Sequence, residues 1–172
     1  MAFNVSRGTR ADMHTHSETS HDSVCRIEDM LLTQLERGTE IMAVTDHLDL
    51  PDYDIDYPFE EFCRGDRIVR ALNDKYKDRC LVLSGVELGE GFWDSALCDR
   101  IMNLIDFDVI LGSIHIIKYK NIDTSFTRID FSVFSEEDIY GFIDKYFDDV
   151  ITMILVKLYH SVGGKIVTLG SE

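Results

Sequence analysis

Apolar runs alternate with amphipathic stretches along the whole chain. Four short runs, 10–16, 40–46, 80–87 and 107–113, are rich in apolar residues and predict buried strands. The stretches between them repeat apolar residues every three or four positions, which predicts helices. A strand followed by a helix, several times over, is typical of a parallel α/β fold. No linker-like or low-complexity stretch interrupts the pattern, so we expect a single domain over residues 1–172.

The expected helices have recognisable starts and stops. Ser23 is the expected N-cap of a helix that ends before Gly38. A polar loop over 47–58 precedes the second helix, and the third spans roughly 93–105. Ser135 opens a long helix that stops at 163–164, and 165–169 forms one more strand. The expected apolar faces are Ile27, Met30, Leu31 and Leu35; Ile68, Val69, Leu72 and Tyr76; Leu97, Ile101, Leu104 and Ile105; and Ile143, Phe147, Val150, Ile154 and Leu158.

Charge excludes one class of function and constrains another. The chain has 17 Lys and Arg against 32 Asp and Glu, a net charge of −15. Non-specific nucleic-acid binding needs a basic face, so it is excluded. A phosphorylated substrate would be repelled at long range unless bound cations reversed the sign locally. A phosphatase with this charge therefore requires metal ligands.

Location and redox state follow from the remaining composition. No apolar run approaches the roughly 20 residues of a membrane helix, and residues 1–12 lack a signal-peptide core. We expect a cytoplasmic protein without membrane contact. Its four cysteines form no C-x-x-C pair and are expected to be reduced core residues: Cys25, Cys63, Cys80 and Cys98.

Each of the four expected strands ends in residues of a type that commonly ligates metals. His14 and His16 end the first strand, where the period of two aims both imidazoles at one side of the sheet. The second strand runs into Asp46-His47, the third into Glu87 and the fourth into His115. In parallel α/β folds these carboxyl ends lie together, so the side chains converge. Buried unpaired imidazoles and carboxylates are costly, whereas a divalent ion satisfies several at once.

The types of the candidate ligands restrict which metals are expected. A mixed set of histidines and carboxylates suits zinc, iron or manganese, and Glu87 is the expected bridge between two ions. Asp22 can reach the same place, although an aspartate just before a helix is more often a cap or a first-turn charge. His21 is either a substrate contact or a solvated loop residue. His160 fits a partner of the helix dipole better than a ligand.

Four stretches, DMHTHSETSHDS, AVTDHLDL, LSGVELGE and FDVILGSIH, resemble the polymerase and histidinol phosphatase (PHP) family, specifically its histidinol-phosphate phosphatase branch. They occur in the family order and cover roughly residues 10–116. The resemblance implies a distorted (β/α)7 barrel of TIM type, here incomplete, with up to three divalent metals at its mouth. It implies catalytic roles for His14, His16, Glu87 and His115 and metal ligation by His14, His16, Asp22, His47, Glu87 and His115.

The resemblance weakens toward residue 172. Family members carry a Gly-His-Leu-Asp-like strand and then a Gly-Ser-Asp-Ala-His-like motif; here GGKIVTLGSE resembles only the approach to the second, with Glu172 in place of its aspartate. We therefore expect a shortened member that lacks the last metal ligands. An incomplete barrel exposes apolar edges, so self-association is also expected.

The implied reaction is hydrolysis of a small phosphomonoester, L-histidinol phosphate first, to L-histidinol and phosphate in histidine biosynthesis. An ion-activated water would attack the phosphorus in line. Two alternatives remain open. H-x-H on a first barrel strand also occurs in zinc amidohydrolases, although the TDHLD and GVE strand ends argue against that class. An inactive shortened domain that binds a metal or a protein partner is the other.

Overall fold

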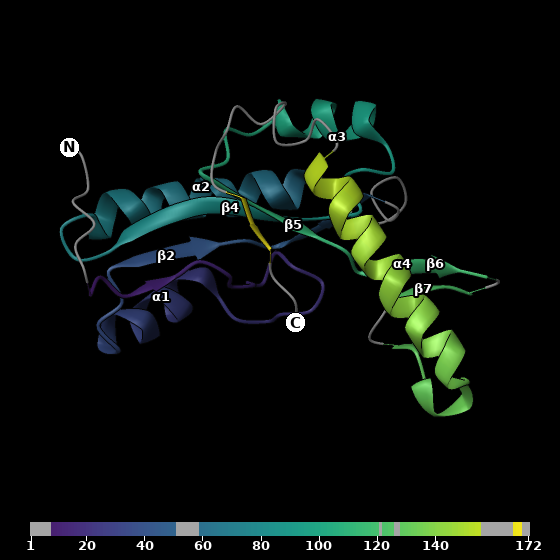
Figure 1. Ribbon diagram of the computed structural model, residues 1–172. Coiled ribbons are helices and arrows are strands. Elements are labelled where there is room, and N and C mark those ends of the chain that lie inside the picture. Colours follow the sequence, from purple (N-terminus) through teal and green to yellow (C-terminus); the bar gives the residue numbers. More distant parts are fainter. Residues whose placement is uncertain (1–7, 51–58, 121, 126–127, 156–166, 170–172) are drawn as a thin grey trace.

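Six parallel strands form the main sheet of the computed structural model, which describes residues 8–50, 59–120, 122–125, 128–155 and 167–169. Their order is β1-β2-β4-β5-β8, with β3 also paired to β4 (Figure 1). The predicted parallel α/β class is confirmed. Within the described part of the chain the sheet is open: β1 and β8 are its edge strands and do not pair with each other. The strands are β1 (Ala11–Asp12), β2 (Ile41–Val44), β3 (His47–Asp49), β4 (Leu81–Gly89), β5 (Val109–Ser113) and β8 (Val167–Leu169).

The segment after β2 differs from the prediction. A polar loop was expected from residue 47, but His47–Asp49 forms β3, which pairs in parallel with residues 87–89 of β4. β2 pairs with residues 81–84 of the same strand, so β2 and β3 form one interrupted strand. At the interruption, Thr45 N donates to Thr15 O and Glu87 N donates to Asp46 O. These bonds keep the segment on the sheet despite its polar sequence.

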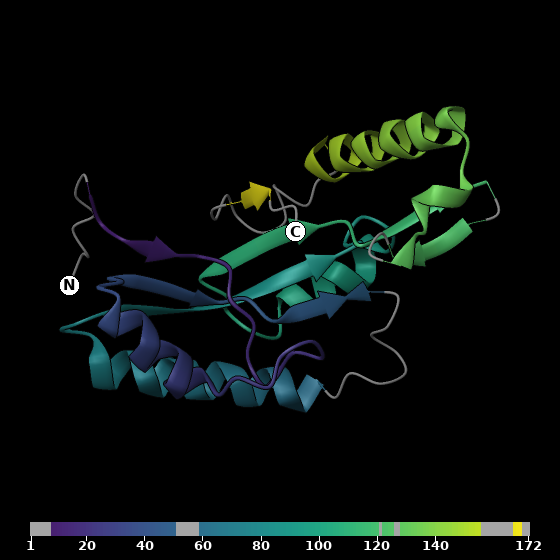
Figure 2. The same ribbon diagram turned by 90° about the horizontal axis from the view of Figure 1, so that it is seen from below.

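Helices α1 (Ile27–Glu36), α2 (Phe59–Tyr76) and α3 (Ser95–Met102) cover one face of the sheet. α1 and α2 lie side by side below it in Figure 2. The predicted faces of α1 and α2 pack with β2 and the first half of β4, and α3 packs with β3, β5 and the second half of β4. One expectation fails here, because Leu104 follows the end of α3 and is 53% exposed.

Two helix starts differ from those expected. α1 begins at Ile27 rather than near Ser23, whose hydroxyl donates to His16 O and accepts from Cys25 N. Ser23 therefore closes the loop after β1 and leaves no cap for the helix. α3 begins at Ser95, because the Asp94 side chain accepts a hydrogen bond from Leu97 N and stops the helix from extending back to Trp93.

Residues 116–155 contain a hairpin that the sequence did not predict and the long helix that it did. β6 (Ile116–Tyr119) pairs antiparallel with β7 (Ile122–Ser125), and α4 (Glu136–Leu155) packs on β6. The Ser135 hydroxyl accepts from Asp138 N, which confirms the predicted start of α4. Tyr119 lies so close to Gly141 that a Cβ there would overlap its ring. The close contact between α4 and β6 therefore requires a glycine at position 141.

The buried face of α4 is not the predicted one. Phe142, Asp149 and Met153 are buried, with Asp149 paired to Lys145, whereas Ile143 and Phe147 are 42% and 56% exposed. Phe142 packs among Tyr119, Phe131 and Phe134, and this aromatic contact turns the helix. Ile143 and Phe147 of the expected face are therefore exposed, whereas Val150 is half-buried. The burial of Ile154 and the placement of Leu158 lie outside the described part of the chain.

The predicted cysteine environments hold in part. Cys80 and Cys98 are buried and Cys63 is half-buried, but Cys25 is exposed in the loop before α1. None of the described helices is long and apolar enough to cross a membrane. The expectations for His160, for residues 163–166 and for Glu172 lie outside the described residues.

The second face of the sheet leads to the site. Ala43, Val109 and Leu111 form a small apolar cluster there with Met13 and Leu83. Glu87 is the register partner of Leu111, so its side chain lies on this same face. A carboxylate buried to 2% exposure beside an apolar cluster needs partners of its own.

Candidate metal centre

The side chains predicted as ligands converge at the carboxyl ends of the strands. They come from the loop after β1, the start of β3, the end of β4 and the residues after β5. Three overlapping groups bring ligand atoms within 4.8 Å of one another: His14, His16 and Glu87; His16, Asp22 and His47; and His47, Asp49 and His115. All six predicted ligands are included, and Asp49 is added. Ligation itself stays a prediction.

The first group joins the H-x-H pair to β4. The Nε2 atoms of His14 and His16 lie 3.0 Å apart, and each is within hydrogen-bonding distance of Glu87 Oε2, at 3.2 and 3.0 Å. Two imidazole nitrogens that face each other beside a carboxylate oxygen could hold a metal ion between them.

The second group uses the other nitrogen of His16. His16 Nδ1 lies 2.7 Å from Asp22 Oδ2, and His47 Nε2 lies 3.4 Å from the same oxygen. Asp22 is therefore turned into the cluster and does not cap α1. The His21 ring, which is exposed, lies 4.8 Å from the His47 ring between centroids, at the edge of the cluster.

The third group contains the residue that the sequence analysis missed. His115 Nδ1 lies 2.7 Å from Asp49 Oδ1, and His47 Nδ1 lies 3.9 Å from Asp49 Oδ2. Ser113 Oγ lies 2.7 Å from His115 Nε2. The signal was present in the sequence, because H-L-D as a strand aims His47 and Asp49 at one side. Because residues 47–49 were expected to form a loop, Asp49 was not predicted to face the site.

Glu87 and His47 connect the groups. Glu87 Oε2 faces His14 and His16, while Oε1 lies 3.2 Å from His115 Nε2. The carboxylate thus spans the first and third groups, as expected of a bridge. His47 is 5% exposed, and within the described part of the chain its Nδ1 has no hydrogen-bond partner. This nitrogen lies 3.3 Å from Glu87 Oε2 and 3.9 Å from Asp49 Oδ2. A buried nitrogen that faces two carboxylates in this way fits a divalent ion, which would satisfy it.

Two histidines of the cluster, His16 and His115, hold a proton more strongly than a free imidazole. Burial opposes the charge on His16, yet hydrogen bonds to Glu87 and Asp22 raise its pKa to about 9. Those to Asp49 and Glu87 raise the pKa of His115 to about 10. The same contacts with His115 and His16 hold the pKa of Glu87 well below its usual value. For His47, burial dominates and lowers the pKa.

Metal uptake should therefore release protons. His16 and His115 are protonated at neutral pH in the metal-free protein, and both must lose a proton to ligate an ion. We expect affinity for zinc to rise with pH and protons to be released on binding at pH 7. Calorimetric titrations in buffers with different ionisation enthalpies measure this release. An observed enthalpy that is independent of the buffer would contradict the expectation.

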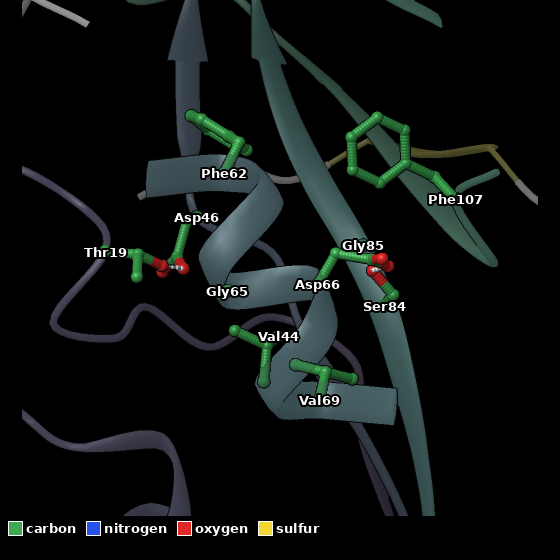
Figure 3. Close-up of a pocket in the computed structure, with 10 residues that line it drawn as sticks. All are labelled: Thr19, Val44, Asp46, Phe62, Gly65, Asp66, Val69, Ser84, Gly85 and Phe107. Carbon is green, nitrogen blue, oxygen red and sulfur yellow. Dashed lines mark hydrogen bonds between the residues drawn. The ribbon is translucent and has the colours of Figure 1, made fainter. Parts of the chain in front are cut away.

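Asp46, a ligand-type residue at a strand end, does not join the cluster. Its carboxylate is 4% exposed and accepts from Ser17 N at 2.5 Å, from Ser17 Oγ at 2.7 Å and from the Thr19 hydroxyl. It faces a small pocket, partly open to solvent, between α2 and the sheet (Figure 3). The pocket contains Gly65, Asp66 and Ser84 but none of the cluster's side chains. Asp46 instead fixes the loop that carries His14 and His16.

Removing this carboxylate should loosen that loop. In Asp46→Ala, a buried N–H and two hydroxyls lose their acceptor, so we expect a loss of about 2–3 kcal/mol in the free energy of unfolding. Asp46→Asn keeps one acceptor oxygen and should lose less. Urea unfolding of both variants measures the order. If Ala and Asn are equally stable, these hydrogen bonds do not hold the loop.

The fold and the cluster together define a class: a parallel α/β domain with a histidine and carboxylate centre at its strand ends. The model of the PHP domain matches residues 12–168, and the chain belongs to this family. The predicted family is thereby confirmed. A comparison with curated proteins gave no match.

Two solved structures share the fold. The first is histidinol phosphate phosphatase HisK from Lactococcus lactis subsp. lactis, solved with zinc, L-histidinol and phosphate: the TM-score is 0.56 and the identity 22%, over 67% of this chain and 43% of that one. The second is a Listeria monocytogenes protein assigned as the histidinol phosphatase HisK, with a TM-score of 0.65 and 16% identity over 82% of this chain and 60% of that one. The chain thus spans only about half the length of these relatives.

Proposed function

We propose that the protein is a metal-dependent phosphomonoesterase and that L-histidinol phosphate is the first substrate to test. The observation that carries the proposal is the Glu87 carboxylate, which spans two ligand groups that share no residue: His14 and His16 with Glu87 itself, and His47 with Asp49 and His115. We assign one divalent ion to each, with Glu87 between them. Zinc is the first metal to try, because the Lactococcus lactis structure contains it.

The charges explain why the ions are needed. The cluster holds three carboxylates, Asp22, Asp49 and Glu87, and its histidines bind metals in their neutral form. A phosphate dianion would be repelled by this set. Bound divalent ions would reverse the local sign, lower the pKa of a water molecule and neutralise the phosphoryl oxygens.

The chain's own residues supply orientation. Asp46 holds the loop that carries the two histidines after β1, and the Ser113 hydroxyl and Asp49 fix the His115 ring from its two nitrogens. Glu87 is 2% exposed, so its oxygens stay where the ligand groups meet. A preorganised cluster of this kind favours positioning and charge stabilisation, the two contributions that phosphoryl transfer requires.

The test is phosphate release by purified protein stripped of metal and reloaded with zinc, manganese or iron. We expect turnover of L-histidinol phosphate only after reloading, and none of amides or cyclic ureas, which separates a phosphatase from an amidohydrolase. A loaded protein that binds metal but hydrolyses no phosphomonoester would refute the enzymatic proposal. An inactive metal-binding domain would then remain.

A further inference from the structure

Glu90 is a fully buried carboxylate next to the metal centre but outside all three ligand groups. It follows β4 directly and has 0% exposure. Its Oε1 accepts from two consecutive backbone groups, His115 N at 2.5 Å and Ile116 N at 2.8 Å. These are the first residues after Ser113 and Ile114, where β5 has ended and the β6–β7 hairpin begins.

The backbone explains this placement. The β4–β5 ladder ends with Gly89 opposite Ser113, and Glu90 N still donates to Ser113 O at 3.2 Å. Glu90 then adopts a left-handed conformation, φ +53°, and β4 turns away through the bond from Trp93 N to Glu90 O. The N–H groups after β5 thereby lose the strand that would have paired with them. The Glu90 side chain takes its place.

We propose that Glu90 is a positioning residue for the metal centre: its carboxylate fixes the backbone at residues 115–116, so that the His115 ring faces Asp49 and Glu87. The proposal rests on the metal centre of the proposed function and adds a residue to it. The His115 ring has no freedom in this arrangement, because Nδ1 lies 2.7 Å from Asp49 and Nε2 lies 3.2 Å from Glu87. A shift of its backbone would break both contacts.

A packing role alone does not account for an acid here. Glu90 is 0% exposed, and both backbone N–H groups donate to Oε1 alone. Its second oxygen, Oε2, is buried and has no hydrogen-bond partner among the described residues. An apolar side chain of similar size would fill the space without the cost of burying a carboxylate. The acceptor oxygen is what an apolar residue cannot supply.

The experiment uses Co(II) as the probe, with the full chain and the variants Glu90→Gln, Glu90→Asp and Glu90→Ala. Gln keeps the acceptor at the same reach, whereas Asp keeps the charge on a side chain one methylene shorter. We expect Gln to bind Co(II) with wild-type stoichiometry and visible spectrum. Ala and Asp should bind the ion at His115 about 10- to 100-fold more weakly, since outer ligand-orienting contacts have effects of this size. Circular dichroism selects the folded variants.

Combination with ligand variants separates positioning from general damage. In a His115→Ala background, Glu90→Ala should cause no further loss of Co(II), whereas in a His14→Ala background it should still cause one. Unchanged Co(II) binding by folded Ala and Asp variants would overturn the proposal, as would further loss in the His115→Ala background. If Ala and Asp do not fold, the Gln variant decides, because loss of Co(II) there contradicts the acceptor role. A wild-type chain that binds no Co(II) would instead refute the metal centre itself.

Discussion

Replacing Glu87 by glutamine should abolish metal-dependent phosphatase activity. The carboxylate faces His14 and His16 with one oxygen and His115 with the other, so its loss weakens both ligand groups at once. Loss of a contact that only orients a metal ligand lowers metal affinity or activity about 10- to 100-fold. Because Glu87 is proposed to lie between two ions, its replacement should lower kcat/KM at least about 100-fold. Bound zinc should fall below one ion per chain.

The control is Glu36→Gln on the exposed side of α1, which removes the same charge away from the site. Elemental analysis of both variants after gel filtration measures the bound zinc, and phosphate release measures the rate. A Glu87→Gln protein that keeps both ions and its activity would remove Glu87 from the centre. The comparison also excludes net charge as the cause, because both variants lose one carboxylate.

Gly89→Ala should remove one ion and leave the other. A Cβ at this position would overlap Asp49 Oδ1 and come within 3.0 Å of His115 Nδ1, two members of the third ligand group. Neither can move away freely, because His115 is held by Ser113 and Glu87 and Asp49 is 8% exposed. We expect about one zinc per chain instead of two, and a loss of activity of at least about 100-fold.

Gly112→Ala is the matched control in the neighbouring strand. Its Cβ would meet the end of the Met153 side chain at 3.0 Å, and a flexible thioether can move aside. This variant should keep both ions and the activity. Retention of two ions by Gly89→Ala would show that Asp49 and His115 do not form a site. If both variants lose metal, the cause is general disturbance of the sheet.

The sequence predicted which side chains converge at the strand ends better than it predicted the local structure around them. His14, His16, His47, Glu87 and His115 were found because parallel strands end at a common edge, and this rule depends only on the order of strands. Asp22 was equally compatible with a helix cap, and only the loop closed by Ser23 decides between the two. Asp49 was missed because its strand is held by bonds to β4, which a local pattern does not contain.

The helices likewise show that a local sequence pattern does not contain the tertiary contacts that orient an element. The faces of α1 and α2 follow from periodicity because both helices lie flat on the sheet. α4 instead packs on the β6–β7 hairpin through Phe142, and its rotation is set by the aromatic cluster and by Gly141. Apolar periodicity identifies a stripe on a helix, but it does not say which partner the stripe meets.

Two histidines, His16 and His47, each belong to two of the three ligand groups. This sharing should restrict how many metal ions can bind at the same time. His16 offers Nε2 to the first group and Nδ1 to Asp22, and His47 offers Nε2 to Asp22 and Nδ1 to the third group. A neutral imidazole has only one free lone pair, so it serves one ion at a time. An ion beside Asp22 would therefore compete with an ion in either of the other two groups. We expect a third ion to bind more weakly than the first two, and an excess of metal to inhibit the proposed two-ion centre.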